Sequence, residues 1–239
     1  MEPILEANNI VKFLGAGEAE VKVLKGVNLE LMPGELTLLM GPSGSGKTTL
    51  LSILGCILTP SEGTLRIGPH TATGLKAEGL ADLRRKHVGF VFQSYNLVPT
   101  LTATENVMLA LDLRGTKLSD APALAAEALR KVGLSHRAHA YPSKLSGGEK
   151  QRVAIARSLA GSPSVILADE PTAALDGENG RAVMALLSEV AKDKGRGILV
   201  VTHDHRTLSY ADRLIRIEDG KIVGRARRRA RPGNGAAAA

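Results

Sequence analysis

The stretch that most constrains this chain is residues 41–48, Gly-Pro-Ser-Gly-Ser-Gly-Lys-Thr, which match the pattern G-x-x-x-x-G-K-[ST]. They follow an apolar run, Leu36–Met40, that is typical of a buried strand, and a helical pattern, Gly46–Gly55, begins within them. Glycines here allow successive backbone N–H groups to turn inward around phosphate oxygens, and the helix start adds the positive end of its dipole. The sequence therefore predicts a strand, a loop and a helix that together hold the phosphates of a nucleotide.

The side chains of this loop have separate expected roles. Lys47 would reach the β- and γ-phosphates of ATP, and the hydroxyl of Thr48 would bind Mg²⁺. The other residues expected to bind the nucleotide here are Gly41, Pro42, Ser43, Gly44, Ser45, Gly46 and Thr49. An accidental glycine-rich turn is the alternative, which the strand pattern before it and the helical pattern after it disfavour.

A second apolar run, Val165–Ala168, ends in two adjacent acids, Asp169 and Glu170. At the carboxyl end of a buried strand beside a phosphate loop, Asp169 would hold Mg²⁺, and Glu170 would orient and polarise an attacking water. Two solvated acids that start a loop are the alternative interpretation. It is the less favoured one, because a phosphate loop requires such a partner.

The third motif is residues 145–152, Leu-Ser-Gly-Gly-Glu-Lys-Gln-Arg, which lead into a helical pattern. Ser146 is of the residue type that caps helices, and Gly147 and Gly148 leave the helix start bare, so the motif predicts a second anion-binding helix N-terminus. One nucleotide has only one γ-phosphate, which the first loop already holds. The two motifs therefore predict that two subunits each contribute half of a site.

The rest of the chain alternates short apolar runs with helical patterns, which indicates an α/β fold. Buried strands are expected at Leu36–Met40, Val88–Phe92, Val165–Ala168 and Ile198–Thr202, more exposed antiparallel strands at Ile4–Val11 and Val27–Met32, and a hairpin at Leu214–Glu218 and Lys221–Val223. Helices are expected at Gly46–Gly55, Ala103–Leu113, Ala121–Val132, Ser146–Ala160 and Asn179–Lys192. The interval from 94 to about 141 has no strand pattern, which predicts a helical insertion.

The motif at 145–152 resembles the signature of ATP-binding-cassette (ABC) ATPases, and the surrounding motifs follow that family's order over about residues 4–224. The resemblance implies an α/β P-loop NTPase fold of the ABC ATPase type, with a parallel-sheet RecA-like core, an antiparallel β subdomain and a helical subdomain at about 94–160. It implies one nucleotide-binding domain at 1–224, followed by a basic, disordered tail at 225–239. It also implies ATPase activity with ATP and Mg²⁺ bound.

The resemblance assigns roles to further residues. Gln93 matches a glutamine that contacts Mg²⁺ and water, and His203 matches a histidine that contacts the γ-phosphate. Asp176 falls in a loop that crosses the dimer interface, and Phe13 stands where related cassettes carry an aromatic residue that stacks on adenine, with core packing as its alternative role. The implied catalytic residues are Lys47, Gln93, Glu170 and His203, the implied Mg²⁺ ligands are Thr48, Gln93 and Asp169, and the implied signature contacts to nucleotide are Ser146, Gly147 and Gly148.

Cassettes of this family serve different machines, and the sequence separates them. The interval between Gly41 and Ser146 is too short for the long coiled coil of a DNA-maintenance ATPase, and a translation factor would need two cassettes. An inactive nucleotide-sensing regulator would be expected to lack Lys47, Glu170 or His203, and all three are present. The remaining class is the ATPase subunit of a membrane transporter. Because no run of about 18 apolar residues occurs, its transmembrane permease is expected to be another chain.

Within this class, segments 23–27, 53–56, 92–97 and 101–107 resemble the branch that contains MacB, LolD, DevA and FtsE. This implies a cassette that forms a head-to-tail homodimer on ATP, at the cytoplasmic face of the inner membrane, and drives a MacB/LolD-type permease in efflux, lipoprotein handling or envelope export. A cell-division ATPase of the FtsE type, which acts on a membrane partner without transport, stays open as the alternative. The expected permease surface is the groove beside Gln93 and the stretch 95–101.

Net charge is concentrated at one end of the chain. The formal net charge is +7, and the five arginines between 225 and 231 leave only +2 on residues 1–224. A solvated tail without a specific partner is the first interpretation of this run. Binding to anionic lipid, at about 1 kcal/mol per arginine, is the second. Nucleic acid is not an expected partner, because no aromatic residues lie between these arginines to stack on bases. The single cysteine, Cys56, fits a reducing cytoplasm.

Overall fold

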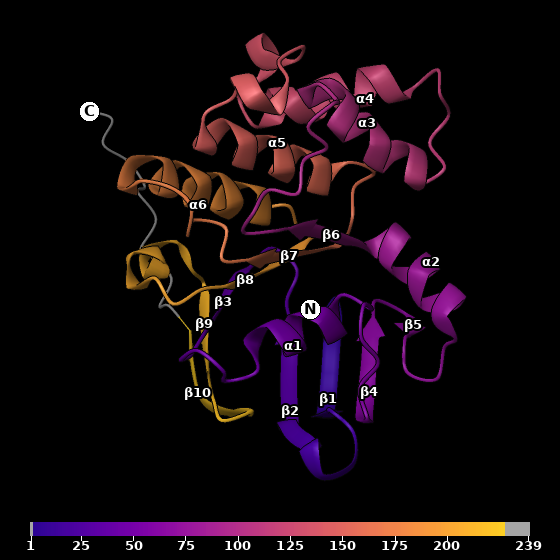
Figure 1. The fold of residues 1–239 in the computed structure, drawn as a ribbon, viewed down its shortest axis with the longest axis vertical. Coiled ribbons are helices and arrows are strands. Elements are labelled where there is room, and N and C mark those ends of the chain that lie inside the picture. The colour runs from indigo at the N-terminus through magenta and orange to yellow at the C-terminus, as the bar shows by residue number, and fades with distance from the viewer. Residues whose placement is uncertain (1, 228–239) are drawn as a thin grey trace, which may run out of the picture.

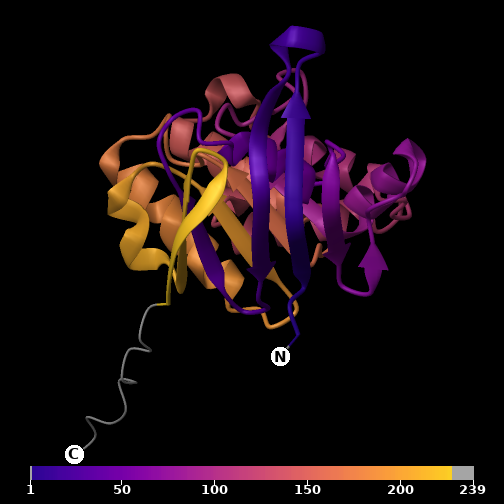
Figure 2. The same cartoon turned by 90° about the horizontal axis from the view of Figure 1, so that it is seen from below.

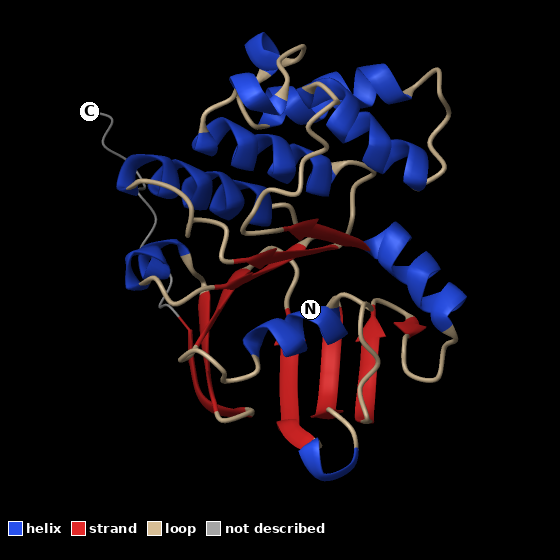
Figure 3. Cartoon of the chain, in the orientation of Figure 1, coloured by secondary structure: helices blue, strands red, loops and turns tan. Residues whose placement is uncertain are grey.

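The computed structural model describes residues 2–227, and a six-stranded sheet with the order β10-β9-β3-β8-β7-β6 forms their centre (Figure 1, Figure 3). Its strands are β3 (Leu36–Met40), β6 (Val88–Val91), β7 (Val165–Asp169), β8 (Gly197–Val201), β9 (Arg213–Glu218) and β10 (Lys221–Arg227). All neighbouring strands are parallel except β9 and β10, which form an antiparallel hairpin. The carboxyl ends of the parallel strands therefore meet at one edge, where loops can build a site.

A second, antiparallel sheet has the order β2-β1-β4-β5. Its strands are β1 (Leu5–Leu14), β2 (Val21–Leu31), β4 (Glu62–Ile67) and β5 (His70–Thr71). Figure 2 shows β1 and β2 as two long arrows side by side, joined at one end by a short 3₁₀ helix, Gly17–Ala19. The expected strands Ile4–Val11 and Val27–Met32 were therefore right in kind but too short.

Helices fill the space between the sheets and cover the far face of the central sheet (Figure 1). The α-helices are α1 (Lys47–Leu54), α2 (Ala77–His87), α3 (Ala103–Leu113), α4 (Ala121–Lys131), α5 (Gly147–Leu159) and α6 (Gly177–Ala191), and three further 3₁₀ helices span Ser135–Arg137, Pro142–Lys144 and His205–Tyr210. Helix α1 packs with the antiparallel sheet in one hydrophobic core, and α3 to α6 pack together in the other.

The central strands bury both of their faces, which explains their uninterrupted apolar runs. Leu38 and Ile166 point into the core shared with α3 to α6, whereas their neighbours Leu39 and Leu167 point into the core shared with α1 and the antiparallel sheet. The predicted central strands match the observed ones to within one residue for this reason. Helix α2 and the strands β4 and β5 were not predicted.

The structure corrects the expected start of the tail. Arg225 and Arg227 belong to strand β10, where they pair with Ile215 and Arg213 of β9. The Nη2 atom of Arg225 donates to the carbonyl of Asn28 at 2.8 Å, and Arg227 pairs with a glutamate of the segment before β3 at 2.5 Å. These two arginines were not predicted as part of a strand, because an exposed edge strand can continue without an apolar pattern. The other residues of the expected tail, 228–239, lie outside the described residues.

A pair of truncations tests this correction. We expect a chain that ends at 227 to keep the melting temperature of the full chain. A chain that ends at 224 should lose about 1–2 kcal/mol of unfolding free energy, because it lacks three ladder residues and two guanidinium hydrogen bonds. In a domain of this size that corresponds to a melting temperature lower by about 3–6 °C. Equal melting temperatures for the two truncated chains in a thermal scan would contradict the assignment.

Candidate functional site

A pocket of about 610 Å³ opens at the carboxyl ends of β3, β7 and β8. It gathers most of the residues predicted to bind nucleotide, from motifs far apart in the chain. They are Gly41, Pro42, Ser43, Gly44, Gly46, Lys47, Thr48, Thr49, Gln93, Asp169, Glu170 and His203. Val23 and Val201 also line the pocket and were not predicted, because single valines carry no motif.

The loop at 41–48 has the close-packed backbone that its glycines predict. Gly46 precedes α1 with a φ of 94°, a left-handed conformation that favours glycine. A Cβ on Gly41 would lie 2.0 Å from the carbonyl oxygen of Ile217, so only glycine fits there. The Nζ atom of Lys47 donates to the carbonyls of Gly41 and Pro42, at 2.8 and 2.7 Å. These bonds hold the ammonium group inside the loop's curve.

Three oxygen donors beside this loop suit a magnesium ion. Burial, and then the charge of Glu170, raise the pKa of Asp169, while Lys47 and the hydroxyl of Thr48 lower it. A cation would offset the unfavourable burial of this carboxylate. Hydroxyl, carboxylate and amide oxygens, here those of Thr48, Asp169 and Gln93, are the hard ligands that Mg²⁺ prefers. Within residues 2–227 no three His, Cys, Asp or Glu side chains cluster as a metal site.

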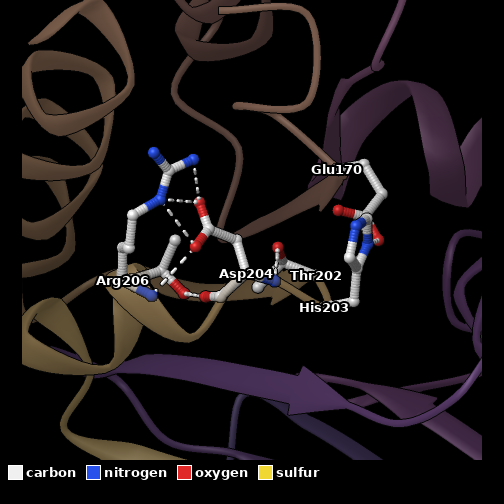
Figure 4. A network of polar contacts seen from close by, with 6 residues as sticks. Glu170, Thr202, His203, Asp204 and Arg206 are labelled. Carbon is white, nitrogen blue, oxygen red and sulfur yellow. Dashed lines mark hydrogen bonds and ion pairs between the residues drawn. The ribbon is translucent and has the colours of Figure 1, made fainter. Parts of the chain in front are cut away.

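Glu170 and His203 contact each other across the pocket (Figure 4). The Nδ1 atom of His203 lies 2.7 Å from Oε1 of Glu170. The glutamate side chain is 15% exposed and the histidine side chain 74%, so the carboxylate is sheltered while the ring faces solvent. Glu170 has a φ of 45°, rare for a residue with a side chain, and its N–H donates to the carbonyl of Val201 at 2.9 Å. Residues held in such strained conformations concentrate at functional sites.

The turn that carries His203 is fixed by polar contacts that the sequence did not indicate (Figure 4). The N–H of Asp204 donates to the hydroxyl of Thr202 at 3.0 Å. Arg206 forms an ion pair with Asp204 at 2.9 Å, and its side-chain hydrogen bond is the main reason why the pKa of Asp204 is lowered. These contacts hold the backbone on either side of His203.

The signature residues lie at the start of α5 and do not line the pocket of their own chain. Ser146 caps the helix: its Oγ accepts from the N–H of Glu149 at 3.2 Å, and the Glu149 carboxylate accepts from the N–H of Ser146 at 2.8 Å. Arg137 donates to the same carboxylate at 2.8 Å. Gly148 is buried against α6, where a Cβ would lie 2.3 Å from Oδ1 of Asn179. The helix start is therefore capped, and its two glycines add no side chains of their own there.

Three further predicted residues also lie outside the pocket lining. Ser45 is buried within the phosphate loop, with its hydroxyl 2.9 Å from the position that a Cβ on Gly41 would take. Asp176 caps α6, and its hydrogen bond from the N–H of Asn179 lowers the pKa of the carboxyl. Phe13 is half-buried on β1, and the ammonium group of Lys22 lies 5.4 Å from the centre of its ring. The structure brings none of these three, nor the signature, into the pocket.

The cap on α5 makes a pH-dependent contribution to stability. We expect Glu149→Gln to lower the unfolding free energy by about 1 kcal/mol at pH 7. The hydrogen bond from the N–H of Ser146, chiefly, holds the pKa of Glu149 below its usual value of 4.5. The charged form thus stabilises the folded state above pH 4.5, and this contribution is lost as the pH falls through the lower folded-state pKa. Urea unfolding at decreasing pH should show the two proteins converging, and a constant difference would contradict this.

Comparison with known proteins gives the family. The sequence profile of the ABC transporter family matches residues 24–173. The macrolide export ATP-binding/permease proteins MacB of Escherichia coli (strain K12) and of Shigella flexneri are each 44% identical over 223 residues. The match covers 93% of this chain and 34% of either relative, so the chain spans about one third of their length. Every helix among residues 2–227 is too short or too polar to cross a membrane.

Solved structures match over nearly the whole chain. Two dimeric structures of the ATP-binding cassette MJ0796, one of them a post-hydrolysis state bound to ADP and phosphate, are 40% identical with a TM-score of 0.85, over 95% of this chain and 99% of theirs. CbiO1 of Clostridium perfringens, part of the ABC transporter complex cbiONQ, is 28% identical with a TM-score of 0.84, over 95% of this chain and 89% of that one. Sequence profile, relatives and structures agree, and the chain belongs to the ABC transporter family as an ATP-binding cassette with the P-loop ATPase fold.

Proposed function

We propose that this cassette binds ATP with Mg²⁺, hydrolyses it within a head-to-tail pair of cassettes, and drives a transmembrane permease of the MacB/LolD type at the cytoplasmic face of the inner membrane. One observation carries the proposal: the pocket joins a phosphate loop to Glu170 and His203, while the signature that would complete it lies elsewhere on the same chain. The dimeric structures of MJ0796 support the pairing.

The side chains of the pocket would divide the chemistry of phosphoryl transfer to water. Lys47 would neutralise charge on the transferring phosphoryl group together with the N-terminus of α1. Glu170 would hold and polarise the attacking water, and its contact with His203 at 2.7 Å would orient it toward the γ-phosphate. Thr48, Gln93 and Asp169 would hold Mg²⁺, which supplies further charge neutralisation on the phosphates.

The second cassette would complete the site. Ser146, Gly147 and Gly148 of one copy would cover the phosphates bound by the other copy, because a helix start without bulky side chains lets backbone N–H groups approach an anion closely. Asp176 would lie at the interface between the copies, at the start of α6. Phe13 would stack on the adenine base from strand β1. Each copy would thus supply the phosphate loop of one site and the signature of the other in a symmetric pair of sites.

The permease would dock on a groove between α2, β6, α3 and α5. Its volume is about 480 Å³, and apolar side chains such as Phe90, Leu109 and Leu113 line it. Among the described lining residues four are arginines and none is an acid. An amphipathic segment with an acidic side chain fits a groove of this composition. Asn96, which belongs to the predicted stretch 95–101, lines this groove.

Cross-linking from single cysteines tests the docking. Cys56 is buried, and burial raises the pKa of its thiol to about 11, so an introduced surface cysteine is the reactive one. With the Glu170→Gln background and ATP, we expect Leu113→Cys, in the groove, to cross-link to a membrane-spanning protein in isolated membranes. Leu118 is 82% exposed and lies outside the groove, so the control Leu118→Cys should not cross-link to that protein. Equal labelling of both, or partners from ribosomes or DNA alone, would overturn the transport assignment.

Anionic lipid remains a proposed partner of the chain's last arginines. Arg225 and Arg227 already bind protein groups, so the proposal now rests on Arg228, Arg229 and Arg231. Three arginines would contribute about 3 kcal/mol near an anionic surface. Co-sedimentation with vesicles that contain phosphatidylglycerol should therefore weaken when residues 228–239 are removed. Unchanged sedimentation would exclude lipid binding by this segment.

A further inference from the structure

The short segment 93–96 connects the two sites described above. Its first residue, Gln93, lines the nucleotide pocket, and its last, Asn96, lines the groove proposed for the permease. Tyr95 and Asn96 both have left-handed backbone conformations, with φ of 62° and 50°. Such conformations are uncommon for residues other than glycine and asparagine, so Tyr95 in particular needs surrounding contacts to hold the segment in this shape.

Arg157 supplies those contacts from helix α5. Its Nη2 atom donates to the carbonyl of Tyr95 at 2.8 Å, and its Nη1 atom donates to the carbonyl of Asn96. The side chain also lines the groove. Burial, with no neighbouring charge contributing, lowers the pKa of this guanidinium. A planar guanidinium holds its donors in a fixed fork, so two of its nitrogens can each bind one of two successive carbonyls, whereas a lysine offers a single ammonium nitrogen.

The same helix also contacts the segment at Tyr95 and the residue before the segment, Phe92. Near its start, Gly147 packs beside Tyr95, whose hydroxyl would lie 3.1 Å from a Cβ at that glycine. One turn further, the amide of Gln151 donates to the carbonyl of Phe92 at 3.4 Å. Helix α5 thus begins with the signature and contacts residues 92, 95 and 96 from three of its turns, and Figure 1 shows it between the central sheet on one side and α3 and α4 on the other. Arg157 is the one of these residues that binds the segment with two hydrogen bonds.

We propose that Arg157 is a positioning residue that locks segment 93–96 to helix α5, so that Gln93, the groove and the signature move as one body. This inference rests on the proposed function, since it assigns Arg157 a part in turnover and in the response to the permease. Loss of the guanidinium frees the segment and misplaces Gln93. The phosphate loop is untouched, so nucleotide affinity stays while turnover falls.

The test compares Arg157→Ala and Arg157→Lys with the control Arg196→Ala. Arg196 is also half-buried and donates to a backbone carbonyl, that of Pro163, at 3.1 Å, but it lies before β8 and away from the pocket. Since the chain has no tryptophan, Ser94→Trp in each background reports on the segment directly by fluorescence anisotropy. Turnover and ATP affinity are measured without the added tryptophan.

We expect Arg157→Ala to lower kcat about tenfold with KM for ATP within about twofold, and to lower the anisotropy of the Ser94→Trp reporter. Arg157→Lys should recover part of the turnover and part of the anisotropy. Both Arg157→Ala and Arg196→Ala should lower the melting temperature, but Arg196→Ala should leave turnover and anisotropy unchanged. Turnover and anisotropy in Arg157→Ala that equal those of Arg196→Ala would overturn the proposal. A wild-type chain without ATPase activity would contradict the proposed function instead, and the anisotropy comparison would still decide whether Arg157 holds the segment.

Discussion

Glu170→Gln should reduce ATP turnover by a factor of about 10²–10⁴ and leave ATP binding intact. The amide keeps the size of the side chain and a contact to His203, but it cannot accept a proton from the attacking water. Phosphate release measures the loss, and titration with a fluorescent ATP analogue measures the retained binding. Because the bound nucleotide is no longer consumed, size-exclusion chromatography with ATP should show dimers that persist.

Glu189→Gln is the matched control for this substitution. Glu189 lies near the far end of α6, where its side chain is 69% exposed and pairs with Lys192. The same change of charge there should leave turnover and dimerisation as in the unsubstituted chain. Normal turnover in Glu170→Gln would remove the assigned role of this carboxylate. Loss of ATP binding would show that the substitution damages the pocket and not only the chemistry.

Lys47→Ala should weaken ATP binding by about 100-fold, since charged hydrogen bonds of about 1.5–3 kcal/mol each to the phosphates are lost. In the described structure the ammonium group sits in the curve of the loop, bonded to Gly41 and Pro42. Removing it leaves the backbone N–H groups of the loop but no side-chain positive charge. Isothermal titration with ATP measures the affinity, and turnover should fall with it at any practical nucleotide concentration.

Lys192→Ala controls for the loss of a positive charge, because Lys192 is 70% exposed and far from the loop in sequence. It should bind ATP as the unsubstituted chain does. ATP affinity in Lys47→Ala within about threefold of that of Lys192→Ala would show that the loop does not hold the phosphates as proposed, since even one charged hydrogen bond is worth more.

The central sheet and the helices beside it could be predicted because burial on both faces leaves continuous apolar runs. Helix α2 could not, since only Leu83 of its eleven residues is buried and six of the others are polar or charged. Strand β4 was missed for a similar reason, because it buries only Leu65 and Ile67. The end of β10 was assigned to a tail because exposed arginines carry no strand signal. Buried elements could thus be predicted from their apolar patterns, whereas strand pairing at an exposed edge could not.

The candidate site was predictable where a short motif follows a strand, because strand ends meet at one edge of a parallel sheet. Lys47, Asp169, Glu170 and His203 came together for this reason. Contacts between distant side chains and backbone carry no such signal. The pair of Asp204 and Arg206, only two residues apart, was missed because no motif marks it. The carbonyl contacts of Arg157, 61 and 62 residues away in sequence, were missed for the same reason. The roles assigned to Phe13 and Asp176 remain predictions.

The pocket and the start of α5 lie apart on one chain. ATPase activity should therefore depend on the protein concentration. If each functional site draws on two copies, activity per molecule in dilute solution rises in proportion to protein concentration until most copies are paired. Two copies tethered to one membrane assembly would instead meet at an effective concentration fixed by the tether, in the millimolar range for short flexible connections. The membrane partner would then act as an activator by raising the encounter rate alone, without altering any group in the pocket.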